Sequence, residues 1–461
     1  MNSIIEAVVE NLKRELEDFF KELPTVSDVE QYAMTRLKET ALQLTACYAE
    51  ETDRILYEDK AGRKVAGLVL ERRKDQRSLL TMCGELTYSR SYYQLRDGTY
   101  SHPIDELLEV GKYQRISRET TEALAKEAAE GSYEKAGKVV TGGAVSRQTV
   151  MKAVRSCEAK KEAVSEVRRV KVLHIDADED HVSLQNGKTR IVPLISVYEG
   201  LEEIGGKKRK RHQCREVFHY SEEKYSEDFW DNAVNEIERR YDLTDTVVYL
   251  HGDGAQWIKQ GKENFKECRH VLDGYHKNKA KKAFFAGVKK GECLSEKSGL
   301  NSAFITGDQS LLLDIWRKRM EQNPEYGESI TEAMNYLYNN LEGISIRYQD
   351  REARNGGGTE PHVSHVLSSR LSSRPMGWSD KTLKHLVPIL ASRSGVQLIE
   401  KAADKTIPEI VLSAAKVMTG RKLPNLRRAP AIVAPDSRYR TEVINNGQLN
   451  QLYRTIRGLS R

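Results

Sequence analysis

The sequence predicts a multidomain protein of mixed α and β structure, in which helices precede and follow a central sheet. Two observations support this class. The chain of 461 residues, 39% hydrophobic and 31% charged, is too long for a single core and too apolar for disorder. Its hydrophobic period also changes from helical to strand-like near residue 170 and returns to helical near residue 277.

The first 160 residues are expected to be mostly helical. An apolar residue recurs every three or four positions from Ile4 to Phe19, and Pro24 ends this first helix. Ser27 and Glu30 predict a capping box for a long second helix.

A β-hairpin element is expected over residues 79–112. Threonines and tyrosines favour strands here, and Asp97-Gly98 favours a tight hairpin turn. The stretch contains no pattern of catalytic residues.

Residues 113–165 are expected to contain a helix-turn-helix. A helix through Leu124 ends near Gly131, a short helix covers 132–140, and Ser146 caps a third helix. This last helix is led by polar and basic residues, which fit the major groove of DNA. Its outward face carries the expected DNA-binding residues Arg147, Gln148, Lys152 and Arg155. Plain helical bundles share this geometry, so an interpretation without DNA stays open.

Residues 166–280 are expected to form a sheet domain. The expected elements, in order, are strands 170–185, 190–198 and 215–220, helix 229–237, strand 246–250, helix 257–265 and strand 268–272. Asn186-Gly187 makes the first turn. The order βββαβαβ is that of an RNase H-like domain, whereas a Rossmann fold would open with βαβ.

The remaining chain is expected to be helical around a glycine-rich loop at 356–358. A helical insertion would precede the final helices of the sheet domain. The expected divisions of the chain are 1–78, 79–112, 113–165, 166–280, 281–354, 355–405 and a basic region 406–461.

Basic residues are concentrated in two places, the run 207–211 and the region 416–461. The formal net charge is +6, yet residues 416–461 alone carry ten basic and two acidic side chains. Such clusters attract polyanions through counterion release, although solvated loops give the same composition. The expected DNA contacts from the clusters are Lys207, Lys208, Arg209, Lys210, Arg211, Arg427 and Arg428.

Acidic residues follow two strands that would be neighbours in an RNase H-like sheet. Asp176, Asp178 and Asp180 share one face of the first strand, and Asp253 follows strand 246–250. Carboxylates of this kind hold two divalent ions in phosphodiester cleavage. One aspartate of the first strand is therefore expected to lie opposite Asp253.

A third carboxylate is expected from a late helix. Glu360 begins a helix behind the glycine loop, while Glu342 and Glu352 are competitors. Gly252 and Gly254 are expected to leave room for a ligand beside the second aspartate. Individually, these acids could be solvated strand ends or helix-terminal residues. A calcium loop is excluded, because its sixth and twelfth positions would be histidine and glycine.

A polar pair, Asp273 and His276, follows the last strand. Asp273 is an expected N-cap, and His276 is placed to orient a phosphate or the nucleophile. No phosphate-binding loop or serine nucleophile motif occurs, which disfavours an ATPase or serine hydrolase. The six scattered cysteines and the lack of a long apolar run predict a cytoplasmic protein that does not enter a membrane.

Several of these residues together resemble the ISLre-type transposases of bacterial insertion sequences. The resemblance spans nearly the whole chain and rests on the stretches 178–182, 250–254, 273–276 and 360–378. The last contains the distinctive run Ser373-Arg-Pro-Met-Gly-Trp378. That group was long filed as an uncharacterised protein family and is related to Mutator-like DDE transposases.

The resemblance implies magnesium-dependent DNA strand cleavage and joining, with manganese as a substitute. It assigns the metal ligands to Asp178, Asp253 and Glu360, and an Asp-x-x-His signature to Asp273 and His276. Members of that group often have Glu at the position of Asp176, which favours Asp178; Asp176 remains the alternative first ligand.

The sequence therefore predicts a DNA transposase that binds terminal inverted repeats as a dimer or higher oligomer, associated with the bacterial nucleoid. The alternative is a DNA-binding regulator or domesticated protein without catalysis. A stand-alone nuclease is a third interpretation, and it would cleave DNA without joining it.

Overall fold

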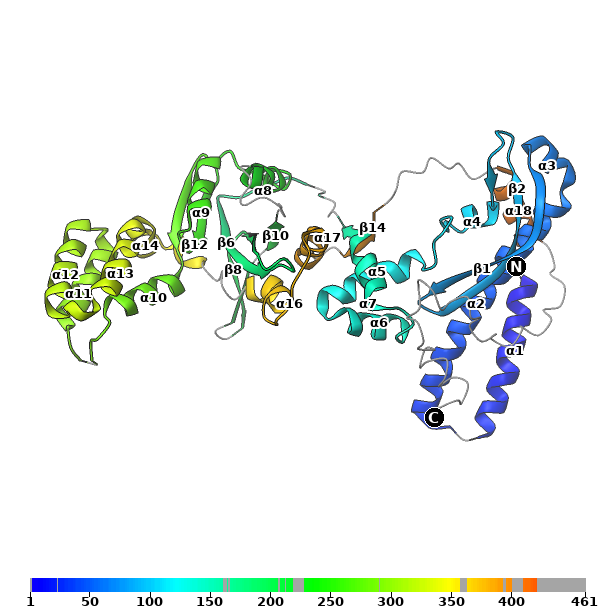
Figure 1. The fold of residues 1–461 in the computed structure, drawn as a ribbon, viewed down its shortest axis with the longest axis horizontal. Helices are drawn as coiled ribbons and strands as arrows, with labels where there is room; N and C mark the ends of the chain where they lie inside the picture. The colour runs from blue at the N-terminus through cyan, green and yellow to red at the C-terminus, as the bar shows by residue number, and fades with distance from the viewer. Residues whose placement is uncertain are drawn as a thin grey trace. The chain divides into compact units, whose positions relative to one another are not determined.

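The computed structural model has the expected mixed α and β structure and divides into two compact units, residues 1–157 with 396–461 and residues 158–395 (Figure 1). The structure describes residues 2–22, 24–160, 164, 166–205, 208–211, 213–218, 228–289, 291–356, 363–392, 395–399 and 409–420. Within these ranges no helix is long and apolar enough to cross a membrane. The six cysteines form no disulfide.

The first unit combines long helices with a three-stranded sheet, as expected for its helical N-terminus. Its helices are α1 (Asn2–Lys21), α2 (Val26–Glu58), α3 (Lys60–Ala66), α4 (Pro103–Leu107), α5 (Arg118–Glu130), α6 (Tyr133–Thr141), α7 (Arg147–Arg155) and α18 (Glu409–Gly420). The capping box of α2 is formed by Thr25 and Asp28, so the prediction of Ser27 and Glu30 was wrong by two residues.

The sheet of this unit starts ten residues earlier than the sequence predicted. Its strands are β1 (Val69–Thr81), β2 (Gly84–Gln94) and β3 (Tyr100–Ser101), in the order β1-β2-β3. The long hairpin therefore turns at residues 82–83, and the predicted turn Asp97-Gly98 connects β2 to β3 instead. One face of β1 is exposed and carries charged residues. The sequence analysis therefore did not recognise the first part of this strand.

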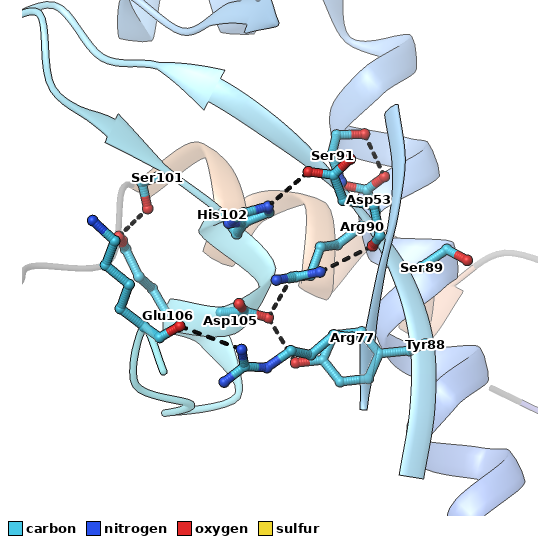
Figure 2. Close-up of polar contacts among 12 residues, drawn as sticks. Asp53, Arg77, Tyr88, Ser89, Arg90, Ser91, Ser101, His102, Asp105 and Glu106 are labelled. Carbon is cyan, nitrogen blue, oxygen red and sulfur yellow. Dashed lines mark hydrogen bonds and ion pairs between the residues drawn. The ribbon is translucent and has the colours of Figure 1, made fainter. Parts of the chain in front are cut away.

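A buried polar network attaches α4 to this hairpin (Figure 2). Asp105 accepts a hydrogen bond from the Tyr88 hydroxyl at 2.7 Å and lies 2.8 Å from Arg90 Nε. Asp53 accepts two hydrogen bonds from Ser91, and burial raises the pKa of its carboxyl. The buried carboxylates of Asp53 and Asp105 thus each accept hydrogen bonds, which offset the cost of burying them.

The second unit is built on a five-stranded sheet with the order β10-β7-β6-β12-β13. Its strands are β6 (Val172–Ser183), β7 (Thr189–Tyr198), β10 (Arg215–Phe218), β12 (Val247–Gly252) and β13 (Cys268–Leu272). The first three are antiparallel, and β6, β12 and β13 are parallel. The other strands are short: β4 (Cys157–Ala159), β5 (Arg168–Arg169), β8 (Leu201–Gly205), β9 (Lys208–Arg211), β11 (Tyr241–Asp242) and, in the first unit, β14 (Val396–Leu398).

The two faces of this sheet differ in chemistry. On one face, alternate residues of β6 and β12 pack against α8 (Asp228–Glu238) and α9 (Gln256–Gln260). This core contains Leu173, Ile175, Ala177, Val248, Leu250, Phe229, Trp230, Ala233, Ile237, Trp257 and Ile258. The other face carries the intervening residues of both strands, which include histidines and aspartates.

A helical region follows β13 and has its own core. Its elements are α10 (Gly274–Phe284), α11 (Leu294–Thr306), α12 (Gln309–Gln322), α13 (Gly327–Asn339), α14 (Leu341–Gln349) and two 3-10 turns (Pro324–Tyr326 and Glu352–Asn355). Leu272, at the end of β13, belongs to the core of this region. The chain then continues through a π-helical turn (Ser364–Ser368), α16 (Ser369–Leu371) and α17 (Asp380–Ala391).

Candidate functional site

The first two predicted carboxylates belong to neighbouring strands: Asp178 is in the middle of β6, and Asp253 directly follows β12. In the parallel pairing of β12 with β6, His251 is opposite Asp176. The recorded pairing ends there, and Asp178 and Asp253 are each two residues beyond this pair along their own segments. The negative charges of Asp178 and Asp253 both raise the pKa of His276, so both carboxylates lie within electrostatic reach of this histidine.

The predicted pair Asp273 and His276 completes this group. Asp273 is only 1% exposed, and its Oδ1 accepts hydrogen bonds from the backbone N–H groups of Tyr275 and His276, which makes it the N-cap of α10. Its Oδ2 lies 2.6 Å from His276 Nδ1. This hydrogen bond is the main cause of the raised pKa of His276, against the opposing effect of burial.

Asp176, the alternative first ligand, has a buried side chain with partners inside the protein. It is buried, accepts a hydrogen bond from the Tyr198 hydroxyl at 3.0 Å and forms an ion pair with Arg211. The Arg211 guanidinium also lies over the Tyr198 ring. Arg211 was expected to contact DNA as part of a basic loop, but it lies on strand β9 and pairs inward.

The third predicted carboxylate, Glu360, lies outside the described residues. The chain just after it returns to the sheet, because Ser372 Oγ donates a hydrogen bond to Asp180 Oδ1 at 2.8 Å. The Trp378 backbone N–H also donates to the Ser183 carbonyl at the end of β6. The competitor Glu342 is 79% exposed and pairs with Lys262.

The last competitor, Glu352, is on a 3-10 turn and accepts a hydrogen bond from Asn355 Nδ2. Just beyond this turn, a Cβ on Gly356 would lie 2.0 Å from His251 Nε2. Only glycine allows the chain to pass this close to β12 before it continues towards Glu360.

Gly252 and Gly254 do not leave room for a ligand, contrary to the sequence prediction. A Cβ on Gly252 would meet Ile258 at 2.8 Å and the Ala177 carbonyl at 3.0 Å, and one on Gly254 would meet Asn340 at 2.3 Å. The space beside both glycines is filled by the protein itself, so they are required for internal packing.

Three buried histidines lie in the strands of this sheet, and the sequence analysis did not single them out. His174 and His251 share the face of Asp176, whereas His270 pairs with Leu250, whose side chain lies on the opposite face. His174 Nδ1 is 3.1 Å from His251 Nε2, and the His174 ring stacks on Tyr198 and Tyr249. Burial lowers the pKa of His174 and of His270 to about 4. These rings are therefore neutral packing groups at neutral pH.

No three His, Cys, Asp or Glu side chains converge on a metal site among the residues that the structure describes. The neighbouring carboxylates Asp178 and Asp253 supply hard oxygen donors, which suit magnesium. Their donor set fits part of such a site, and a further ligand would have to come from residues such as Glu360.

Three of the four residues predicted to contact DNA from helix α7 are exposed. Arg147, Gln148 and Lys152 are exposed, whereas Arg155 is partly buried. The buried side of α7 packs on α5 and α6 through Val150, Ala153 and Val154. The Arg147 guanidinium forms an ion pair with Glu134 on α6.

The basic clusters are only partly described. Lys210 is exposed, and Lys208 and Arg209 lie on β9 rather than in a loop. Lys207, Arg427 and Arg428 lie outside the described residues, as does the region 421–461.

The sequence analysis also missed Tyr336 and Asn340, which contact the turn that carries Asp253. Tyr336 donates a hydrogen bond from its hydroxyl to the Asp253 carbonyl oxygen. No local pattern could have identified these residues, because they follow the turn by more than eighty positions.

Comparison with known proteins identifies relatives along almost the full chain. A protein of Caldanaerobacter subterraneus subsp. tengcongensis, named a UPF0236 protein, is 34% identical over 477 residues, covering 97% of this chain and 96% of its own. Two further UPF0236 proteins of that organism are each 34% identical over 434 residues, covering 89% of this chain and 86% and 82% of theirs. The model of a family described as "Uncharacterised protein family (UPF0236)" matches residues 20–404. The chain therefore belongs to the UPF0236 family.

Proposed function

We propose that this protein is the DNA transposase of an insertion sequence, which binds the terminal inverted repeats and catalyses metal-dependent strand cleavage and 3′-hydroxyl strand transfer. The observation that carries the proposal is that Asp178 on β6 and Asp253, just after the neighbouring strand β12, both act electrostatically on His276. Carboxylates brought together from adjacent strands are the arrangement that phosphodiester chemistry with two metal ions requires.

The proposed metal ligands are Asp178, Asp253 and Glu360. Bound magnesium, or manganese in its place, would supply an activated attacking oxygen and relief of charge on the leaving oxygen. Asp176 is a weaker candidate for first ligand, since Arg211 and Tyr198 already occupy its carboxylate.

His276 has a role of its own in this proposal. Its Nδ1 faces Asp273, which leaves the opposite edge of the ring, Nε2, available for a phosphate oxygen. The raised pKa keeps the ring protonated to higher pH than an ordinary histidine, so it can donate a hydrogen bond to an anionic substrate.

The architecture agrees with this chemistry. The order of the main strands and helices, with three antiparallel strands followed by alternating helices and strands, supports an RNase H-like domain. The region 281–354 would be its helical insertion. In the first unit, α6 and α7 would act as a helix-turn-helix, and the exposed Arg147, Gln148 and Lys152 would read base edges.

Double-stranded DNA is the proposed partner, and synapsis of two element ends would need at least a dimer of the chain. The names of the relatives support a mobile element. One name joins eleven locus labels and another joins four. A protein sequence found at many loci of one genome is the pattern that a self-copying DNA element leaves.

The test uses the full-length chain and a labelled duplex made from inverted repeats that flank the gene. Asp178→Asn, Asp253→Asn and Glu360→Gln should each abolish cleavage and strand transfer in magnesium while leaving DNA affinity unchanged. Their effects should be non-additive, because the three groups act as one unit. Calcium should support DNA binding with little turnover, because its coordination is longer and looser.

Glu342→Gln is the matched control, because that carboxylate is exposed and should be dispensable. Full activity in all three site variants would refute the mechanism. Cleavage without joined products would indicate a nuclease, and DNA binding without cleavage by the wild type would indicate a regulator.

A further inference from the structure

The turn that carries Asp253 is held from outside the sheet by helix α13. The Tyr336 hydroxyl donates a hydrogen bond to the Asp253 carbonyl oxygen. Within the turn, the Ala255 N–H donates to Asp253 Oδ1 at 2.8 Å, so the carboxylate is fixed relative to its own backbone. A group that fixes the carbonyl of this residue therefore also fixes its carboxylate.

In a second contact, Gly254 of the same turn packs against Asn340 at the end of α13. Gly254 has a φ of +87°, and a Cβ there would lie 2.3 Å from Asn340 Oδ1. Asn340 is 5% exposed, and its Nδ2 donates to the Tyr336 carbonyl at 2.9 Å. The Asn340 Oδ1 atom is buried and has no hydrogen-bond partner among the residues that the structure describes. Buried polar atoms in native proteins usually have such a partner, so this close packing against the turn is unusual.

Helix α13 also contacts α10, the helix whose first turn carries the second pair of predicted site residues, Asp273 and His276. Their shared core includes Phe284, Met334 and Leu337. One rigid helix thus contacts both segments that carry the predicted catalytic side chains.

From these contacts we infer that Tyr336 and Asn340 are positioning residues, through which the helical region 274–355 sets the Asp253 carboxylate for metal binding. The inference rests on the proposed function. Displacement of a reacting group by about 1 Å costs roughly a hundredfold in rate, so a single lost hydrogen bond at this turn should be visible in the kinetics.

The decisive variant is Tyr336→Phe, which removes only the hydroxyl. Tyr338→Phe is the matched control, because Tyr338 lies on the same helix and donates its hydroxyl to Gln309, away from the turn. In the full-length chain, Tyr336→Phe should lower the single-turnover cleavage rate about tenfold or more and raise the magnesium concentration for half-maximal rate. DNA affinity in calcium should not change.

A measurement without DNA separates this inference from the proposed function. Manganese affinity, followed by electron paramagnetic resonance, should weaken in Tyr336→Phe and stay at the wild-type value in Tyr338→Phe. If both variants match the wild type in manganese affinity, the inference is overturned, whether or not the wild type cleaves DNA. If the wild type binds manganese but never cleaves, the proposed function fails and the affinity difference still supports the positioning role.

Asn340→Ala provides a second line of test should Tyr336→Phe fail to fold. It removes the amide that holds the end of α13 and should weaken manganese binding in the same direction. Wild-type manganese affinity in a folded Asn340→Ala protein would contradict the inference.

Discussion

At the scale of single residues, two aspartates on one strand have opposite surroundings. Asp178 is partly exposed and lies within electrostatic reach of His276, whereas Asp176 is buried against Tyr198 and Arg211. A carboxylate that pairs with a partly buried arginine and a buried tyrosine hydroxyl has a structural role, since removing its charge would weaken both contacts.

Asp176→Asn should therefore reduce stability more than chemistry. Loss of one partner of a buried ion pair costs on the order of 3 kcal/mol, so the free energy of unfolding in urea should fall by about that amount. Cleavage per folded molecule should stay close to that of the wild type. An unchanged stability together with abolished cleavage would instead identify Asp176 as the first metal ligand.

His276 is expected to affect chemistry strongly and stability in a pH-dependent way. Its pKa is raised in the folded chain, chiefly by Asp273, so its ion pair stabilises the fold fully below the unfolded pKa of about 6.5. That stabilisation is lost as the pH rises through the folded pKa. His276→Ala should thus lower the thermal midpoint at pH 6 and leave it nearly unchanged at pH 9.

Cleavage by His276→Ala should be reduced at both pH values when activity is expressed per folded molecule. The control is His385→Ala, a histidine on α17 outside this group. Normal cleavage with a large stability loss at every pH would make His276 a purely structural residue.

At the scale of elements, helix α7 combines a buried apolar side with an exposed polar side. Its N-terminus is fixed by Ser146, whose Oγ accepts a hydrogen bond from the Thr149 N–H. This places the exposed residues on a rigid helix, as base recognition in the major groove requires.

Combined substitution of Arg147, Gln148 and Lys152 by alanine should remove the preference for element ends. Each good base contact contributes about 1–3 kcal/mol of discrimination, so the ratio of end to random DNA affinity should approach one in gel-shift titrations. Lys126→Ala, at an exposed position of α5, is the control. Retention of the end preference by the triple variant would show that another element reads the sequence.

At the scale of the whole molecule, charge is distributed unevenly along the chain. The segment 421–461 is rich in arginine, while the preceding helix α18 belongs to the fold. Val411 and Ala414 of α18 share a core with Leu56 and Tyr93. A truncation that tests the basic tail should therefore end the chain after Gly420 and keep α18.

Truncation after Gly420 should weaken binding to end and random DNA alike. The slope of log K against log salt should become shallower by about 0.9 for each phosphate contact that is lost. Titrations at several salt concentrations measure this change, and the thermal midpoint checks that the fold is intact. A selective loss of end binding would show that the tail reads sequence.

Much of the second unit could be predicted from local pattern. The strand predicted at 268–272 coincides with β13, and the strand predicted at 246–250 differs from β12 by two residues. Buried parallel strands form continuous apolar runs, which are easy to recognise. The strand β1 was missed over its first ten residues, because a strand with one exposed face carries many charges.

The sequence by itself determined the order of the main elements, the hairpin turn at Asn186-Gly187 and the presence of acids on β6 and just after β12. These features depend on period, turn chemistry and local propensity, which neighbouring residues set. Only the tertiary structure decided that Arg211 pairs inward with Asp176, that Gly254 is required by Asn340 and that Tyr336 holds Asp253. Such contacts join residues far apart in the chain, and they form only when strand order and helix packing bring those residues together.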